Sequence, residues 1–347
     1  MAKKLKVGFI GIGGIAQGCH VPGWQALDYC EIVAAADVNP KTLKAGGEKA
    51  GIPEARLYTD YKKMLSEVDL DIIDVCTPNC IHKQPTIDAF AKGCHVIVEK
   101  PMTTSVADAK KMIAASEQAG KLLMIAQSMR FGDDALAMKR WVDEGLVGDI
   151  YWGRASYLRP RGVPAWGAFI VKELSAGGPC YDLAVHILDL CLYLMGHPEP
   201  VAVSAAMYLE ISNKPSLMKH DPKKYTVPEE LAVGFIRFAN GATLSLETSW
   251  AINSAAPNNG IMLAGTRGGI RNNPPTLTRE EAGLLVDSTV QVNPDRGIAS
   301  HSEEIRQFAE AVKNGGPSPV PGAQALMTQR ILDGLYKSAQ QGKEVKV

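Results

Sequence analysis

The feature that most constrains the fold is a series of short apolar runs, each followed by a stretch of helical composition. The runs are rich in β-branched residues and lie at Val7–Ile10, Ile32–Ala36, Ile72–Val75, Val96–Val98 and Leu122–Ile125. Nearly continuous apolar strands that alternate with helices are typical of a parallel sheet covered on both faces. The pattern therefore predicts a doubly wound α/β domain, of the Rossmann kind, over residues 1–126.

The chain changes character beyond a helix that we expect around Asp134–Glu144. Strand-like runs follow at Ile150–Tyr157, Val201–Tyr208, Leu231–Phe238 and Ala242–Trp250, with helices expected at Cys180–Met195, Glu303–Lys313 and Ala323–Ala339. The last run alternates apolar and polar residues, which favours a half-buried antiparallel strand, and Asn240-Gly241 before it predicts a hairpin. We therefore expect residues 127–347 to form an α+β domain with a largely antiparallel open sheet, whose C-terminal helices are able to pack back on the first domain.

Composition excludes several classes of protein. The 347 residues include 37 basic and 37 acidic side chains, a balance that argues against binding nucleic acid mainly through its phosphates. No uncharged apolar run approaches the ~20 residues that cross a bilayer, and the N-terminus lacks the apolar segment of a signal peptide. We therefore expect a folded chain with neither a nucleic-acid nor a membrane partner.

The cysteines indicate a reducing compartment. There are seven of them, an odd number scattered through apolar segments, which favours free thiols and a cytoplasmic location. Cys76 and Cys80 are spaced as a metal-binding pair could be, but no second pair or His-x-His cluster accompanies them. We therefore expect no metal site.

A glycine-rich turn follows the first strand directly. Its sequence, Gly11-Ile12-Gly13-Gly14-Ile15-Ala16, matches the dinucleotide-binding pattern G-x-G-x-x-G/A. In this pattern the first glycine makes a tight turn, the second lets the backbone approach a pyrophosphate, and the small third residue lets helix and strand pack closely. The helix that begins here offers free N–H groups and a partial positive charge to phosphates. A glycine-rich turn that binds no ligand is the alternative.

The residue after the second strand indicates which dinucleotide binds. Asp37 lies about 20 residues beyond the turn, where an acidic side chain would accept hydrogen bonds from the adenosine ribose. No arginine follows it in Val38-Asn39-Pro40 to accommodate a 2′-phosphate. This arrangement predicts NAD rather than NADP. As an alternative, Asp37 caps the helix that starts near Pro40.

Two further strands end in polar residues. Ile72–Val75 runs into Cys76-Thr77-Pro78-Asn79 and then His82, and Val96–Val98 runs into Glu99-Lys100-Pro101. Ligands of open α/β sheets bind outside the carboxyl ends of the strands. We therefore expect these residues to surround the cofactor, with Lys100 near the nicotinamide.

Asp182 and His186 are the candidate catalytic pair of the second domain. They are four residues apart on a predicted helix and so share a face, and glycines before them would let the helix start close to a ligand. Imidazole is suited to take a hydroxyl proton near neutral pH. A histidine that only packs on the helix, with an i, i+4 carboxylate partner, is the alternative.

Taken together, these segments resemble the Gfo/Idh/MocA family of oxidoreductases, named after glucose-fructose oxidoreductase and inositol dehydrogenase. The resemblance spans nearly the whole chain, and its most specific parts are Glu99-Lys100-Pro101 and the segment from Gly177-Gly178-Pro179-Cys180 through His186. It implies nicotinamide-dependent oxidation or reduction of a sugar or cyclitol that lies between the nucleotide domain and the second domain's sheet. Family members are commonly dimers or tetramers through this sheet. Pro179 and Cys180 depart from the usual glycine and small residue, which leaves the local pocket shape open.

The resemblance also implies roles for individual residues. His186 would be the base, Lys100 would hydrogen-bond the reacting oxygen and stabilise its developing negative charge, and Asp182 would hold the substrate or the base. Arg130 stands where the family often has a residue that faces the cofactor or substrate, although arginines near domain junctions often form ion pairs.

A proline- and glycine-bearing loop after a strand offers further substrate contacts. Tyr157, Arg159, Arg161 and Trp166 lie in it, and aromatic and arginine side chains would suit stacking on and hydrogen bonding to a sugar. A purely structural loop is the alternative. The segment favours a glycoside oxidised at a ring hydroxyl such as C3, with inositol as the close competitor. We expect His220 and His301 to be solvated and His95 to be structural.

Three functions remain open from the sequence. The first is an NAD-dependent dehydrogenase acting on a sugar, glycoside or cyclitol. The second is a glycosidase that uses tightly held NAD for transient oxidation, and the third is a non-catalytic NAD-binding sensor. The joint presence of Lys100 and His186 argues against the sensor.

Overall fold

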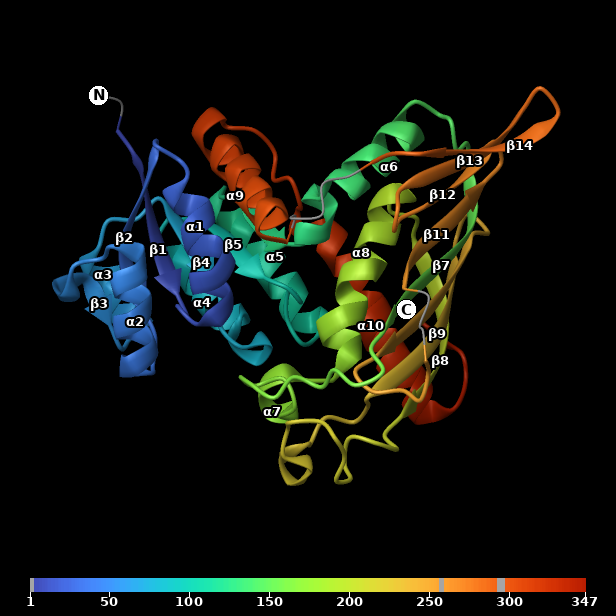
Figure 1. The fold of residues 1–347 in the computed structure, drawn as a ribbon. Helices are drawn as coiled ribbons and strands as arrows, with labels where there is room; N and C mark the ends of the chain where they lie inside the picture. Colours follow the sequence, from blue (N-terminus) through green and yellow to red (C-terminus); the bar gives the residue numbers. More distant parts are fainter. Residues whose placement is uncertain (1–2, 256–258, 292–296) are drawn as a thin grey trace. The chain divides into compact units, whose positions relative to one another are not determined.

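The computed structural model describes residues 3–255, 259–291 and 297–347. These residues fall into two compact units (Figure 1). The N-terminal unit comprises the chain through Phe131 together with residues 297–326, and the C-terminal unit comprises Gly132 to residue 291 and Met327–Val347. Each unit is therefore built from two separate stretches of the chain.

The N-terminal unit contains a six-stranded sheet in which every pair of neighbours is parallel. Its spatial order is β3-β2-β1-β4-β5-β6, formed by β1 (Leu5–Ile10), β2 (Cys30–Ala36), β3 (Leu57–Tyr58), β4 (Ile72–Val75), β5 (His95–Glu99) and β6 (Leu123–Ala126). This order is that of a doubly wound nucleotide-binding domain, so the predicted fold class is confirmed. β3 was missed because a two-residue strand gives no recognisable apolar run.

Helices pack against this sheet, and one of them comes from near the end of the chain. They are α1 (Val21–Gln25), α2 (Pro40–Ala50), α3 (Tyr61–Glu67), α4 (Lys83–Ala91), α5 (Val106–Ala119) and α9 (Gly297–Asn314). α9 lies beside α1 in Figure 1, and its Ile305 and Phe308 are fully buried in the same core as Phe9. Gly23 of α1 permits this approach, because a Cβ there would lie 2.7 Å from the Ile305 side chain.

The strand order reverses between β1 and β4, which lie side by side. The chain leaves β1 toward β2 on one side and later enters β4 on the other. Because all strands run the same way, the turns after β1, β4 and β5 meet at one edge of the sheet, where ligands of such folds bind.

The C-terminal unit contains a nine-stranded sheet. Its spatial order is β14-β13-β12-β11-β7-β10-β9-β8-β15, with β7 (Ile150–Leu158), β8 (Pro200–Tyr208), β9 (Leu231–Phe238), β10 (Thr243–Ser249), β11 (Gly260–Gly265), β12 (Gly268–Arg271), β13 (Thr276–Glu281), β14 (Leu284–Thr289) and β15 (Val345–Lys346). The expected largely antiparallel sheet is confirmed. The hairpin at Asn240-Gly241 joins β9 and β10 as expected, and Gly241 has a φ of +86°. β10 is nevertheless parallel to its other neighbour β7, which periodicity along one strand cannot reveal.

Helical segments pack on this sheet: α6 (Asp133–Asp143), a π-helical turn η5 (Cys180–Ala184), α8 (Val185–Leu194) and α10 (Gly322–Gln341), which begins in the N-terminal unit. The short α7 (Lys172–Ser175) instead contacts a loop, where the Lys172 N–H donates to the Thr226 hydroxyl at 2.9 Å. α8 and α10 lie along the sheet in Figure 1. Leu188 of α8, Leu335 of α10 and Leu244 of β10 are all buried, and a Cβ at Gly234 of β9 would overlap the Leu335 side chain.

Within the described ranges no helix combines the length and apolar character needed to span a membrane.

Candidate active site

The glycine-rich turn after β1 divides its glycines between two tasks. Gly11 has a φ of +83°, and a Cβ there would lie 2.7 Å from the carbonyl oxygen of Cys76, so the turn requires glycine for its contact with the end of β4. A Cβ at Gly13 or Gly14 would meet no atom within 4 Å. Ala16, fully buried, begins the helix η1 (Ala16–His20). The turn is therefore tightly packed at Gly11 and has open space at Gly13 and Gly14, as a pyrophosphate-binding loop requires.

Asp37 lies beside this turn and does not cap the following helix. Its Oδ2 accepts a hydrogen bond from the Ile12 N–H at 3.1 Å, and its Oδ1 accepts from the Asn39 N–H at 2.9 Å. Asn39 is the N-cap of α2 and accepts from the N–H groups of Lys41 and Thr42. The capping alternative for Asp37 is thus excluded, and its carboxylate is at the expected nucleotide edge.

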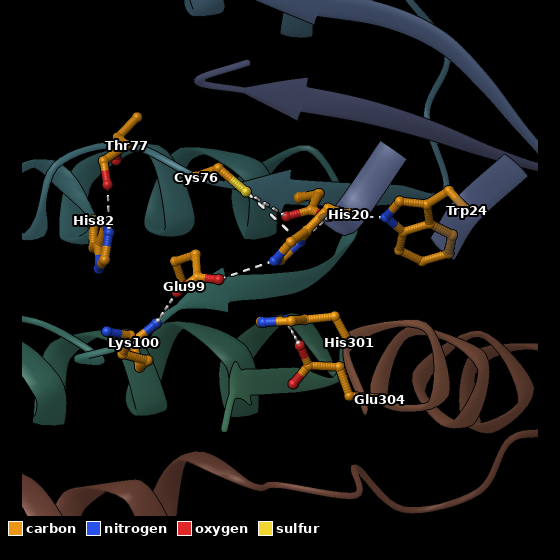
Figure 2. Close-up of polar contacts among 10 residues, drawn as sticks. His20, Trp24, Cys76, Thr77, His82, Glu99, Lys100, His301 and Glu304 are labelled. Atoms are coloured by element: carbon orange, nitrogen blue, oxygen red, sulfur yellow. Dashed lines mark hydrogen bonds and ion pairs between the residues drawn. The ribbon is translucent and has the colours of Figure 1, made fainter. Parts of the chain in front are cut away.

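The segment after β4 is tied to the segment after β5 by His82. This histidine is fully buried, and its Nδ1 lies 2.9 Å from the Pro101 carbonyl oxygen. Its Nε2 lies 2.8 Å from the Thr77 carbonyl oxygen (Figure 2). Asn79, which lies between Thr77 and His82 in the sequence, begins the short helix η3 (Asn79–Ile81). The ring of His82 therefore lies between the backbones of the two segments, with one ring nitrogen near a carbonyl oxygen of each.

Lys100 follows directly after β5 and is half-buried. Its N–H donates to Oε2 of Glu99 at 3.0 Å, and Glu99 is itself buried. The peptide between Lys100 and Pro101 is cis. The structure thus brings Lys100 to the edge that also carries the glycine-rich turn, as the parallel order of β1, β4 and β5 requires.

A buried polar cluster that the sequence pattern did not indicate lies behind Lys100. His20 of η1 places Nδ1 2.8 Å from Asp74 Oδ2 and Nε2 2.9 Å from Glu99 Oε1 (Figure 2). Burial alone would lower the pKa of His20, but the charge of Asp74 and the contacts with Asp74 and Cys76 together outweigh burial, and the pKa lies well above its ordinary value. Burial would raise the pKa of Glu99, but the hydrogen bond and charge of His20 lower it to about 2. His20 and Glu99 therefore form a charged pair at neutral pH.

Two groups in this region have enough potential ligands to be tested as metal sites. His20, Asp74 and Cys76 have ligand atoms within 4.8 Å of one another, and so do His20, Glu99 and His301. His20 contacts Asp74 and Glu99 at hydrogen-bond distance with one ring nitrogen each, so both nitrogens already have a partner. The arrangement is that of a hydrogen-bonded network. Cys80, the predicted partner of Cys76 in a possible metal pair, is exposed and takes no part in either group.

The expectation that His301 and His220 are solvated was wrong. His301, on α9, is half-buried, with Nδ1 2.8 Å from Oε1 of the buried Glu304, and its ring centroid lies 5.8 Å from that of His20. His220 is buried, with Nε2 2.8 Å from the Ser212 carbonyl oxygen. Both sit in polar stretches of sequence, and only tertiary packing covers them.

Asp182 and His186 share the partly exposed face of an otherwise buried helical segment. From Cys180 through Leu192 they alone are half-buried, and every other residue is buried. Oδ2 of Asp182 accepts a hydrogen bond from the indole N–H of the fully buried Trp250 at 2.9 Å. The predicted pairing of a carboxylate and an imidazole on one helix face is therefore present.

The glycines before this pair serve packing, which differs from the ligand approach expected of them. A Cβ at Gly177 would overlap the hydroxyl of Tyr336, and a Cβ at Gly178 would overlap the backbone of Glu229. Oε1 of Glu229 accepts hydrogen bonds from the Gly178 N–H at 2.8 Å, the Tyr336 hydroxyl at 2.6 Å and the Cys180 N–H at 3.3 Å. The start of the helix is thus fixed by one buried carboxyl group.

Glu229 is an unusual acid because the hydrogen bonds described for it come from neutral groups. It is fully buried, and its Oε2 has no hydrogen-bond partner within the described part of the chain. Burial raises its pKa to about 7, although the hydrogen bond from Tyr336 and those from the backbone act in the opposite direction. The group therefore titrates near neutrality while it holds the segment that leads to Asp182.

The residues predicted to contact substrate at the end of β7 and in the loop after it differ in how firmly their side chains are held. Arg161 is held by the carbonyl oxygens of Pro160 and Ile252 at 2.6 and 3.1 Å and by the side chain of Asn253 at 2.6 Å. Arg159 lies over the ring of Tyr157, 5.3 Å from its centroid. Trp166 is 69% exposed and meets Phe169 edge-on. In the N-terminal unit Arg130 is buried, and its Nη1 donates to Gln324 Oε1 at 2.6 Å.

Replacing Glu229 by glutamine is expected to flatten the pH dependence of stability. Because the folded pKa of about 7 is raised above the ordinary 4.5, the contribution of Glu229 is fully present below about pH 4.5 and is lost as the pH rises through about 7. The wild type should therefore lose up to about 3 kcal/mol relative to E229Q across this window. Urea unfolding of both proteins at pH 5 and pH 8 measures this difference; parallel pH profiles would show that Glu229 does not titrate there.

Comparison with known proteins places both units in one family. The profile "Oxidoreductase family, NAD-binding Rossmann fold" of the Gfo/Idh/MocA group matches residues 5–127, and its "Oxidoreductase family, C-terminal alpha/beta domain" matches residues 139–347. D-glucoside 3-dehydrogenase of Escherichia coli (strain K12) is 32% identical, over 100% of this chain and 98% of that protein.

Two further proteins are similar over the full length. D-apiose dehydrogenase of Paraburkholderia graminis is 27% identical, over 99% of this chain and 90% of that protein. The crystal structure of aldose-aldose oxidoreductase from Caulobacter crescentus, complexed with glycerol, superposes with a TM-score of 0.83 at 26% identity, over 99% of this chain and 100% of that chain. With both family profiles matched and the expected nucleotide fold present, this chain belongs to the Gfo/Idh/MocA family of NAD-dependent oxidoreductases.

Proposed function

We propose that this chain is a dehydrogenase that oxidises a secondary ring hydroxyl of a sugar, at C3 of a glycoside in particular, giving a 3-keto glycoside. The full-length similarity to D-glucoside 3-dehydrogenase carries the proposal. It is supported by Asp182 and His186, which together form the partly exposed face of the helical segment from Cys180 through Leu192.

The glycine-rich turn fits NAD. The open space next to Gly13 and Gly14 leaves room for a pyrophosphate at the N-terminus of η1. The half-buried carboxylate of Asp37 lies next to the turn and is suited to accept hydrogen bonds from ribose hydroxyls. Gly11, Gly13, Gly14, Ile15, Ala16 and Asp37 would hold the cofactor, together with Thr77, Pro78 and Asn79 after β4. Bound NAD would supply the hydride acceptor.

The chain's own residues supply the proton chemistry in this proposal. His186 takes the proton of the reacting hydroxyl, because imidazole is a base of suitable strength near neutral pH. Lys100 hydrogen-bonds the same oxygen and stabilises the negative charge that develops on it. Asp182, held by the Trp250 indole, orients the substrate or His186.

Four residues take different roles in this proposal from those expected for them. Glu99, expected to surround the cofactor, faces His20 and accepts the Lys100 N–H. His82 and Arg130 have structural roles. His82 contacts two backbone carbonyl oxygens, and Arg130 donates a hydrogen bond to Gln324. Arg161 stabilises its own loop. Trp166 is the substrate-facing residue we retain with Tyr157 and Arg159, because its exposed ring is free to stack on a sugar or its aglycone.

We also propose that the protein is a homo-oligomer, a dimer or tetramer, through the sheet of the C-terminal unit. On one face of β9, Leu231, Val233 and Phe235 are half-buried, whereas Ala232 and Ile236 on the opposite face are buried. Tyr208 of β8 and Met262 of β11 are exposed apolar side chains of the same sheet. A cytoplasmic location is supported by the seven cysteines, all within the described residues, which are free thiols.

Replacing Lys100 or His186 by alanine should lower kcat by roughly 10²-fold or more, the scale expected for a lost base or a lost charge partner of the reacting oxygen. The dissociation constant of NAD should change far less for H186A, since His186 is outside the nucleotide-binding unit. Steady-state kinetics and fluorescence titration with NAD separate the two effects. Near wild-type turnover of H186A would show that His186 is not the base.

Cofactor choice should depend on Asp37. A carboxylate repels a 2′-phosphate at close range, so we expect a preference for NAD over NADP that D37S reduces by about tenfold or more. Serine keeps an acceptor for the Ile12 N–H, so the turn itself should persist. The ratio of kcat/KM for the two cofactors measures the preference, and equal ratios in wild type and D37S would contradict the assignment.

The substrate assignment is tested by comparing kcat/KM for methyl and aryl glucosides, free glucose and myo-inositol with NAD. We expect the glucosides to react fastest, with a 3-keto product and stoichiometric NADH. NADH formation from inositol alone would identify a cyclitol dehydrogenase. Aglycone release without net NADH would identify a glycosidase with transient oxidation, and activity with none of these compounds in a protein that binds NAD would favour a sensor.

A further inference from the structure

His20 has an unusual environment for a residue directly after a nucleotide-binding turn. It ends η1, its side chain is fully buried, and it lies between the carboxyl ends of β4 and β5 (Figure 2). The groups that face it come from three elements besides its own: Asp74 and Cys76 at the end of β4, Glu99 at the end of β5, and His301 from α9. It therefore connects the glycine-rich turn with the segment that carries Lys100.

Both ring nitrogens of His20 are directed at carboxylates. A neutral imidazole has a single N–H, and its second nitrogen would present a lone pair to an anionic oxygen. The imidazolium donates to both, so its geometry with Asp74 at 2.8 Å and Glu99 at 2.9 Å is that of a doubly charge-assisted contact. The raised pKa of His20 agrees with this protonation state.

The carboxylate of Glu99 transmits this contact to Lys100. Its Oε1 faces His20, and its Oε2 accepts the Lys100 N–H at 3.0 Å, so both oxygens have a partner and the carboxylate cannot rotate without losing one of them. On the other side of Lys100, the Pro101 carbonyl oxygen contacts His82. The backbone of Lys100 is thus held from both sides by groups that lead to buried histidines.

The far end of the network is anchored equally well. Oδ2 of Asp74 also accepts the indole N–H of Trp24 at 2.8 Å, and the Cys76 thiol lies 3.2 Å from Oδ1. Trp24 is buried in α1, the helix that continues η1. His20 therefore lies in a rigid frame, because each of its two partners has further hydrogen bonds of its own.

We propose that His20 is a positioning residue for Lys100, which it fixes through the carboxylate of Glu99. This inference rests on the proposed function, in which Lys100 acts on the reacting oxygen. His20 touches neither substrate nor reacting atoms; it sets where the Lys100 backbone lies relative to the glycine-rich turn.

A double-mutant cycle tests this role. H20Q and E99Q are each made in the wild type and in K100A, with H95Q as the matched control: His95 is a half-buried histidine at the opposite end of β5 and accepts a hydrogen bond from the Leu122 N–H. E99Q keeps the side-chain size and removes one buried charge, so it tests the same link if H20Q does not fold. Circular dichroism establishes folding, fluorescence titration gives the NAD dissociation constant, and steady-state kinetics give kcat.

We expect H20Q and E99Q each to lower kcat by about tenfold, with the NAD dissociation constant changed by less than about threefold, because a misplaced lysine weakens catalysis more than cofactor binding. In the K100A background neither should lower kcat further, since residues that act through one another are not additive. H95Q should leave kcat near the wild-type value in both backgrounds.

Two results would overturn the inference, and they are distinguishable from failure of the proposed function. Wild-type kcat in H20Q or E99Q would show that the network does not position Lys100. An equal loss of kcat in the wild-type and K100A backgrounds would show a general structural effect. If K100A itself kept wild-type turnover, the proposed role of Lys100 would fail, and the inference with it.

Discussion

The parallel pairing of β1, β4 and β5 is the constraint on which the N-terminal unit depends. Parallel strands end at the same edge of a sheet, so the Gly11 turn, the Cys76-Thr77 segment and the Glu99-Lys100 segment are brought together although they are far apart in sequence. The tight contact between Gly11 and the Cys76 carbonyl is a direct consequence, because these two strand ends leave no room for a side chain.

In each unit a buried carboxyl group accepts hydrogen bonds from backbone N–H groups at or near a proposed catalytic residue. Glu99 accepts the Lys100 N–H, and Glu229 accepts the N–H groups of Gly178 and Cys180 ahead of Asp182. The pKa values of these two groups are shifted in opposite directions because their hydrogen-bond partners differ. The His20 imidazolium lowers the pKa of Glu99 to about 2, whereas the donors to Glu229 among the described residues are neutral and its burial raises its pKa to about 7.

Much of the fold could be predicted because strands that are buried on both faces of a sheet consist of consecutive apolar residues. The apolar runs identified five of the six strands of the parallel sheet, and the turn motif located the nucleotide edge. Strands β11–β14 were missed because none of them shows a clear alternation of apolar and polar residues. Glycines begin β11 and β12, charged residues end β13 (Thr276–Glu281), and nearly all side chains of β14 (Leu284–Thr289) are exposed although its first three are apolar.

The sequence by itself determined the local features: the glycine turn, Asp37 after β2, Lys100 after β5, and the i, i+4 spacing of Asp182 and His186. Each depends on neighbours within a few residues. Only the tertiary structure decided that His20 lies between Asp74 and Glu99, that Glu229 fixes Gly178, and that Arg161 is held by Ile252 in the segment after β10. These contacts join residues roughly 50 to 90 positions apart, and a buried polar side chain finds its partner through the packing of strands and helices, which no local pattern encodes.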